Sequence, residues 1–124
     1  MSEVSDTVLM NLYNRLVNWA GYAGGEVARA AVKEKRAERG LSRVETVYTI
    51  QYKTEKTVAA TKALVAMEPD YQDAEDELDA CFVYRKMVES VYSDCERKVS
   101  AASRELSRRL ARRDSENRNG KMNT

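Results

Sequence analysis

The chain has 124 residues, of which 43% are hydrophobic and 33% charged, with one proline, five glycines and a formal net charge of +1. This length suits a single domain, and the composition is too apolar for a disordered chain and too charged for a membrane protein. Histidine is absent, which removes the commonest general base and the commonest metal ligand from the candidate chemistry.

The first helix is predicted over residues 7–39, with Ser5 or Asp6 as its cap. Apolar residues recur at three- and four-residue spacing from its start, namely Val8, Leu9, Leu12, Leu16, Val17 and Ala20. Three glycines between residues 21 and 25 interrupt this pattern. We expect a break or kink there, and the alternative is a glycine face that lets another backbone come close. Gly40 follows a charged run and is a typical C-terminal stop.

A second helix is predicted over residues 43–67. Ser42 and Glu45 have the spacing of a capping box, and Pro69 follows the end of the helix. The segment 46–52 is rich in β-formers and resembles a strand in isolation. Because a cap precedes it and an alanine-rich run follows it, we interpret this segment as helical.

The third helix is predicted over residues 70–113 and carries the clearest pattern of the sequence. The acidic residues of its first turn suit the positive end of the helix dipole. Its core positions follow alternating steps of three and four over five heptads, as in a coiled coil. These positions are Tyr71, Ala74, Leu78, Cys81, Arg85, Val88, Tyr92, Cys95, Val99, Ala102 and Leu106, with one charged member.

Together these elements predict an all-α fold, an elongated antiparallel helical hairpin or three-helix bundle with a long, coiled-coil-like C-terminal helix. Residues 1–113 would form a single helical domain. The polar residues 114–124 would form a disordered tail.

The predicted second helix is shorter than the third. Folded back about Pro69, it covers the third helix only to about residue 95. The rest of the third helix would keep an uncovered apolar seam, and a lone helix with an apolar stripe is marginal in water. We therefore predict an interaction seam for another copy or another protein at Val88, Tyr92, Cys95, Val99, Ala102, Leu106 and Leu110.

Charge is unevenly distributed along the chain. Residues 68–96 carry a net charge of −8 and residues 97–124 a net charge of +6. Two copies of the last helix, paired antiparallel about Tyr92, would bring these opposite charges together, which favours a homo-oligomer. The alternative is that both charge runs are solvated faces.

The basic end of the third helix is a candidate for binding nucleic acid. Arginines at this density could contact phosphates, although few aromatic residues interleave with them to stack on bases. Arginines near a helix C-terminus also stabilise the helix dipole, so a purely structural role is the alternative. The candidate phosphate contacts are Arg104, Arg108, Arg109, Arg112 and Arg113.

No catalytic, cofactor-binding or metal-binding residues are predicted. The acidic run 68–79 could place carboxylates on one helix face, but we interpret it as a solvated helix N-terminus because metal sites in bundles combine ligands from several helices. The sequence has no Gly-rich phosphate loop and no CxxC motif. We therefore expect a non-enzymatic protein without cofactors.

The compartment is predicted from the cysteines and the N-terminus. Cys81 and Cys95 lie 14 residues apart on one predicted helix, roughly 21 Å along its axis, so they cannot pair with each other. Reduced thiols are expected, with an intermolecular disulfide as the alternative. No basic segment followed by an apolar stretch opens the chain, so we expect a cytoplasmic protein without membrane association.

The stretch 43–113 resembles small helical accessory proteins of tailed bacteriophages. The resemblance is carried by the tyrosines of Val47-Tyr48 and Tyr52-Lys53, the acidic start of the next helix, and the ending Ser103-Arg-Glu-Leu-Ser-Arg-Arg-Leu110. It implies a phage-encoded accessory factor in the cytoplasm of an infected bacterium. The sequence thus predicts an assembly protein that self-associates and binds an unidentified protein partner. The alternative is a nucleic-acid-binding accessory protein.

Overall fold

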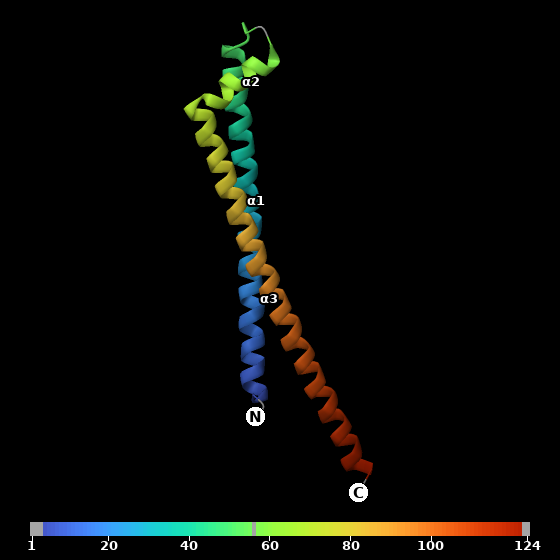
Figure 1. Ribbon diagram of the computed structural model, residues 1–124. Coiled ribbons are helices and arrows are strands. Elements are labelled where there is room, and N and C mark those ends of the chain that lie inside the picture. The colour runs from blue at the N-terminus through green and yellow to red at the C-terminus, as the bar shows by residue number, and fades with distance from the viewer. Residues whose placement is uncertain (1–3, 56, 123–124) are drawn as a thin grey trace. The chain divides into compact units, whose positions relative to one another are not determined.

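The computed structural model describes residues 4–55 and 57–122 of the chain. This part contains three helices and no strand: α1 (Asp6–Gln51), α2 (Val58–Met67) and α3 (Pro69–Met122). Figure 1 labels these helices along the chain. The predicted all-α fold, a helical hairpin with a long C-terminal helix, is therefore confirmed.

Helix α1 runs through all the glycines that were expected to interrupt it. The start of α1 agrees with the prediction, since the backbone amide of Val8 donates to Ser5 Oγ at 3.2 Å. The expected break near residues 21–25 and the expected end at residue 39 are both wrong, because the helix continues to Gln51. No described glycine has a positive φ, so Gly40 does not act as a left-handed helix stop.

The glycines are tolerated because of where they lie on α1. A Cβ at Gly21 or Gly40 would meet nothing within 4 Å, so both positions accept glycine at only its intrinsic helix cost of about 1 kcal/mol. A Cβ at Gly24 would lie 3.2 Å from Cε2 of Tyr92. The alternative prediction, a glycine face that allows close approach, therefore describes the structure better than the expected break. At Gly24 the neighbour that comes close is a tyrosine ring and not a backbone.

The helix expected over residues 43–67 is divided in two. Its first part belongs to α1, where the Ser42 carbonyl accepts a hydrogen bond from the Thr46 hydroxyl at 2.9 Å, so the capping box starts no helix. Its second part is α2, whose N-cap Thr57 accepts from the amide of Ala60 at 3.0 Å. The helical interpretation of residues 46–51 is confirmed. The break itself falls in a turn that begins at Tyr52, which the prediction missed.

Helix α3 begins at Pro69, within one residue of its predicted start, and continues to Met122. The expected disordered tail from residue 114 is therefore wrong as far as Met122, and its last two residues, 123 and 124, lie outside the described residues. The prediction of disorder rests on the polarity of these residues. Most of its residues up to Gly120 are nevertheless compatible with a helix, and the segment contains no proline.

The chain forms two compact units, each with one segment of α1 and one of α3. Unit 1 comprises residues 1–25 and 90–124, of which 4–25 and 90–122 are described, and unit 2 comprises residues 26–89. Two contacts in each unit show that its segments run antiparallel. In unit 1 Asp6 pairs with Arg109 and Gly24 lies beside Tyr92, and in unit 2 Glu34 pairs with Arg85 and Tyr48 with Asp70.

The heptad pattern predicted for α3 is confirmed, because every one of its core positions is half-buried or buried. Helix α1 has a matching pattern that the prediction missed. In unit 1 its half-buried or buried core positions are Leu9, Tyr13, Leu16, Ala20 and Ala23, and in unit 2 they are Val27, Ala30, Glu34, Ala37, Leu41, Val44 and Tyr48. Each unit is thus a two-stranded coiled coil with the alternating steps of three and four on both helices.

The core of unit 2 contains one charged layer. Arg85, the charged member of the predicted pattern, forms ion pairs with Glu34 of α1 and Glu89 of α3. Its hydrogen bond to Glu34 is the main reason why the pKa of Arg85 is raised and that of Glu34 is lowered. Because each charge faces an opposite charge, the layer is tolerated in the seam and favours a single register of the two helices.

Two tyrosines, Tyr48 of α1 and Tyr52 of the turn after it, bind acidic residues at the start of α3 and just before it. The hydroxyl of Tyr48 donates to Asp70 Oδ2 at 2.7 Å, and that of Tyr52 donates to Glu68. The bond to Asp70 raises the pKa of Tyr48 to about 12. The acidic run that begins at Glu68 therefore has a structural role in holding α1 against α3.

Candidate interaction surface

The predicted interaction seam of α3 lies inside the two units. In unit 1, Ala102 is 6% exposed and faces a core that includes Leu9, which is 7% exposed, while Tyr92 packs on Gly24. Five further members of the predicted seam are half-buried, namely Val88 of unit 2 and Tyr92, Cys95, Val99 and Leu106 of unit 1. The expectation of an uncovered seam is wrong, because α1 is longer than predicted and its first segment covers α3. Pairing of two α3 helices about Tyr92 would have to displace α1.

The last predicted seam residue, Leu110, is also assigned to the wrong face. It is 60% exposed, whereas its neighbour Arg109 is only 9% exposed. The alternating spacing explains this, since the step of three from Leu106 leads to residue 109. The prediction followed the apolar residue instead of the spacing.

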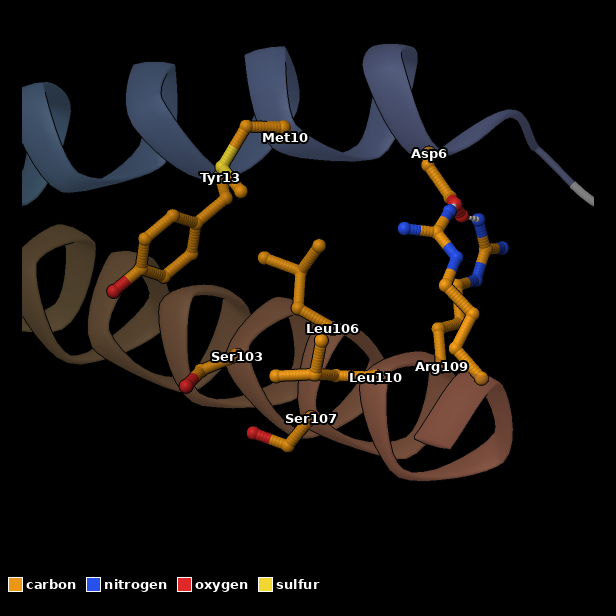
Figure 2. A pocket seen from close by; sticks show the side chains of 9 residues that line it. Asp6, Met10, Tyr13, Ser103, Leu106, Ser107, Arg109 and Leu110 are labelled. Atoms are coloured by element: carbon orange, nitrogen blue, oxygen red, sulfur yellow. Dashed lines mark hydrogen bonds and ion pairs between the residues drawn. The ribbon is translucent and has the colours of Figure 1, made fainter. Parts of the chain in front are cut away.

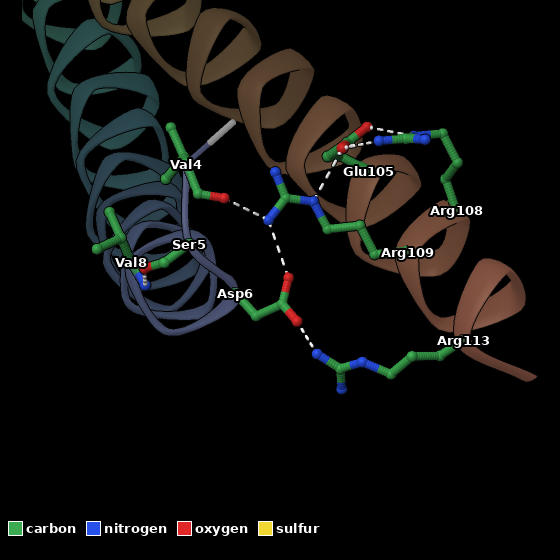
Figure 3. A network of polar contacts seen from close by, with 8 residues as sticks. All are labelled: Val4, Ser5, Asp6, Val8, Glu105, Arg108, Arg109 and Arg113. Carbon is green, nitrogen blue, oxygen red and sulfur yellow. Dashed lines mark hydrogen bonds and ion pairs between the residues drawn. The ribbon is translucent and has the colours of Figure 1, made fainter. Parts of the chain in front are cut away.

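Arg109 joins α3 to the start of α1, as Figure 3 shows. It donates to the Val4 carbonyl at 2.5 Å, to Asp6 Oδ1 at 2.9 Å and to Glu105 Oε1 at 3.0 Å. Hydrogen bonds from Arg108 and Arg109 lower the pKa of Glu105 to about 2. These contacts satisfy the charge of a buried arginine and fix the end of unit 1.

Most of the candidate phosphate contacts already face carboxylates. Arg109 is buried in the network just described, Arg113 pairs with Asp6, and Arg108 pairs with Glu105. Arg112 has an interaction of its own within the chain. Arg104 is exposed and lines a shallow groove with Ser93, Glu96, Arg97 and Ser100. The structure therefore places Arg104 beside Arg97, and not with the other four predicted arginines.

A second groove of unit 1 lies beside the Arg109 network. Figure 2 shows its lining residues, with Leu106 pointing from α3 toward α1 and Met10 on the facing helix. Its wall is apolar at these two residues and at Leu110. Arg109 and Arg113 stand at one end of it with Asp6, which balances much of their charge. The groove consequently offers an apolar surface and no free charged group of the kind that orients an ionic substrate.

The outward face of α1 in unit 1 is the most unusual surface of the described chain. Between Thr7 and Gly25 the sequence contains a single charged residue, Arg15. Large apolar side chains in this segment are nevertheless exposed. Trp19 is 62% and Tyr22 60% exposed, and Val8, Met10, Leu12 and Val17 are exposed as well. A helix that is apolar around most of its circumference is usually buried on more than one side.

Four of these residues, together with Arg15, form a second stripe beside the core positions of α1. We call it the outer stripe: Val8, Leu12, Arg15, Trp19 and Tyr22, all of which are exposed. They are spaced by alternating steps of four and three, so they share one helix face. The rings of Trp19 and Tyr22 meet edge to face, with centroids 6.0 Å apart. The same two rings line a shallow groove with Arg15 and Asn18.

The aromatic residues of the outer stripe differ from those of unit 2 in their contacts with cations. In unit 2, Arg85 lies over Phe82 at 5.4 Å and Lys33 over Tyr84 at 6.0 Å. Among the described residues, no cation lies over Trp19, and Arg15 forms no ion pair. Both halves of a cation–π contact are thus present on the outer stripe without being joined.

Other kinds of site find little support in the described residues. No group of three or more carboxylates or cysteines is arranged to hold a metal ion there. Cys81 and Cys95 are free and half-buried, and burial is the main cause of the raised pKa of Cys81. None of the helices found in the described ranges has a stretch that is long and apolar enough to cross a bilayer.

Comparisons with known proteins assign the chain to no family. No protein-family model matches the chain, and searches of curated proteins and of solved structures found no significant match.

Proposed function

We propose that the chain is a non-enzymatic assembly protein that binds another protein chain through the outer stripe of α1. The exposure of Trp19 carries this proposal. Trp, Tyr and Arg are the residues most enriched among those that dominate binding energy in protein interfaces, and the outer stripe contains one of each. Its spacing suits a helix packed alongside α1.

The energetics of the exposed rings support the same function. Trp19 and Tyr22 are rigid aromatic side chains that lose little entropy on binding and bury a large apolar area. Leu12 and Val8 extend the apolar surface from Trp19 by about three turns toward the start of the helix. Such a contiguous patch, in a stretch with one charge, is typical of a surface that another molecule covers.

The setting we propose is the cytoplasm of an infected bacterium, with the chain as a phage-encoded accessory factor. The tyrosines Tyr48 and Tyr52 and the arginine-rich ending of the stretch 43–113 support this assignment through their resemblance to such proteins. The absence of histidine from the sequence supports a binding role over a catalytic one.

Site-specific photocrosslinking in the native host tests this function. The photoreactive residue p-benzoylphenylalanine would replace Trp19 in one variant and Leu110 in a matched control. These two positions belong to unit 1, have nearly equal exposure and lie on different helices. We expect a protein adduct from position 19 and little from position 110. The absence of any protein adduct at position 19 would overturn the proposed function.

A nucleic-acid accessory protein is the second candidate, and the groove beside Arg104 is the observation that favours it. Arg97 and Arg104 lie there with Ser93 and Ser100, which also donate hydrogen bonds to phosphates. A mobility-shift titration at low salt with DNA and RNA separates the candidates, because phosphate binding would be strongest there and would fall as salt is added. If the chain binds DNA or RNA and the Arg104→Glu variant does not, this second candidate is favoured.

A further inference from the structure

We infer that the occupant of the outer stripe is a second copy of this chain, packed antiparallel, with Arg15 of each copy over Trp19 of the other. This inference rests on the proposed function and makes it more specific. It adds that the surface is self-complementary, so that no other protein is required to cover it.

The charge content of the segment permits such a pairing. Because Arg15 is the only charged residue between Thr7 and Gly25, two outer stripes can approach without burying a carboxylate or a lysine. The remaining members of the stripe are apolar or aromatic. The position of one side chain, Arg15, therefore decides whether two copies fit together.

The orientation follows from that charge. In a parallel pair in register, Arg15 would face the same residue of the other copy, and two like charges in an apolar seam oppose each other. In an antiparallel pair, the two-fold axis would lie midway between residues 15 and 19. Arg15 of each copy then faces Trp19 of the other copy. The guanidinium then lies over the best of the aromatic rings for a cation–π contact.

The same axis brings two further members of the stripe, Leu12 and Tyr22, into register. A pairing that places residue 15 opposite residue 19 also places Leu12 opposite Tyr22. Since a two-fold axis repeats each contact, two leucine–tyrosine contacts flank the two arginine–tryptophan contacts. The steps of three and four on both copies keep these pairs on one straight seam of about two heptads.

The contrast with unit 2 supports a partner that supplies a cation. There the exposed rings of Phe82 and Tyr84 receive cations from their own chain. Trp19 receives none among the described residues, and Arg15 has no ion-pair partner there. A second copy provides both missing contacts at once, whereas an acidic helix of another protein would provide a partner for Arg15 alone.

The seam is short, so the association should be weak. Standard interfaces bury about 800 Å² on each partner, and two heptads on one face of a helix bury less. We therefore expect a dissociation constant on the order of micromolar, with monomers at the lowest concentrations. This sets the concentration range of the experiment.

The test combines light scattering with tryptophan fluorescence. Trp19 is the only tryptophan of the chain, so its emission reports on the outer stripe directly. We expect the full-length chain to change from monomer to dimer as its concentration rises, with a blue shift of the emission over the same range. A chain that stays monomeric with unshifted emission at several hundred micromolar would overturn the inference.

Variants then locate the interface. Arg15→Glu should raise the dissociation constant roughly tenfold or more, because it removes two cation–π contacts and places a carboxylate over each ring. Trp19→Ala, followed by light scattering alone, should leave monomers. Arg104→Glu is the matched charge reversal and Leu110→Ala the matched apolar truncation, and neither should change the dimer. Circular dichroism would verify that each variant is helical. A dimer that survives Trp19→Ala in a folded chain would overturn the inference.

The crosslinking experiment separates failure of this inference from failure of the proposed function. An adduct at position 19 with twice the mass of the chain agrees with both. An adduct with a different protein and no self-adduct overturns the second copy but leaves the proposed function in place. Finding no adduct at that position overturns both.

Discussion

Units 1 and 2 share the same coiled-coil spacing but place their charges in opposite ways. In unit 2 the α1 segment 26–51 has ten charged residues, and the core itself contains the pair of Glu34 and Arg85. In unit 1 the α1 segment 6–25 has only two charged residues, Asp6 and Arg15. Unit 2 thus has a charged outer surface on α1, and unit 1 has an apolar one.

This difference separates two uses of polarity in one type of fold. Charges outside a coiled coil keep it soluble, and a paired charge inside it selects one register. An apolar outer face provides neither benefit and exposes aromatic rings to water. Its presence in unit 1 is understandable if a partner covers that face, which is the basis of the proposed function.

The largest expected effect distinguishes the core of unit 1 from its outer stripe. Leu9 is buried and Leu12 is about half exposed, although they lie one turn apart on α1. Leu9→Ala should lower the free energy of unfolding by about 2–5 kcal/mol, because it leaves a cavity in the core. Leu12→Ala should change the free energy of unfolding by less than about 1 kcal/mol and weaken self-association instead. Urea denaturation of both variants at low protein concentration measures the difference, and equal losses would contradict the distinction between core and stripe.

The second prediction concerns the charged layer of unit 2. Glu34→Leu should lower the thermal midpoint clearly, because Arg85 then loses its partner on α1 in a half-buried position. The double variant Glu34→Leu with Arg85→Leu should regain the midpoint of the parent chain or exceed it, because an apolar pair fits the heptad seam. A thermal melt followed by circular dichroism compares the three chains. If the double variant is less stable than the single one, the layer does not act as a replaceable pair.

Much of the fold can be read from the sequence where the pattern is local. The heptads of α3 are clear because Tyr71 to Leu106 follow the spacing with only one charged exception. In α1 the same spacing passes through Glu34 and through alanines such as Ala23 and Ala30, so few of its core positions are strongly apolar. A core glutamate makes sense only beside Arg85, which is 51 residues away in sequence. That pairing depends on the tertiary fold.

The spacing of the outer stripe is present in the sequence, but the prediction did not separate it from the spacing of the core positions of α1. Val8 and Leu12 belong to the outer stripe, whereas Leu9 and Leu16 belong to the core. The prediction includes all four in one recurring apolar pattern. Separating them needs the exact step of three or four from a fixed core position. The seam error at Leu110 has the same origin, since residue type was given more weight than spacing.

The third prediction compares two glycines of α1 in unit 1. Gly21→Ala should stabilise the chain by about 0.5–1 kcal/mol, because the new methyl group meets nothing and the helix propensity improves. Gly24→Ala should give a smaller gain or a loss, because its methyl group would lie 3.2 Å from the ring of Tyr92. Chemical denaturation measures both variants. A larger gain at Gly24 than at Gly21 would show that the tyrosine ring does not depend on this glycine.

The smallest expected effect is a pH dependence that differs between the two units. In unit 1, Glu105 has a pKa of about 2 in the folded chain against an ordinary value of 4.5, because Arg108 and Arg109 hydrogen-bond to its charged form. Its contribution to stability is therefore complete above pH 4.5 and is lost as the pH falls toward 2.

In unit 2 the pKa of Tyr48 is raised from 10 to about 12 by its bond to Asp70, so its contribution is complete below pH 10 and is lost as the pH rises toward 12. The thermal midpoint of Glu105→Gln should approach that of the parent chain between pH 4.5 and 2, and that of Tyr48→Phe should do so between pH 10 and 12. If either difference stays constant across its window, the corresponding contact does not stabilise the folded chain.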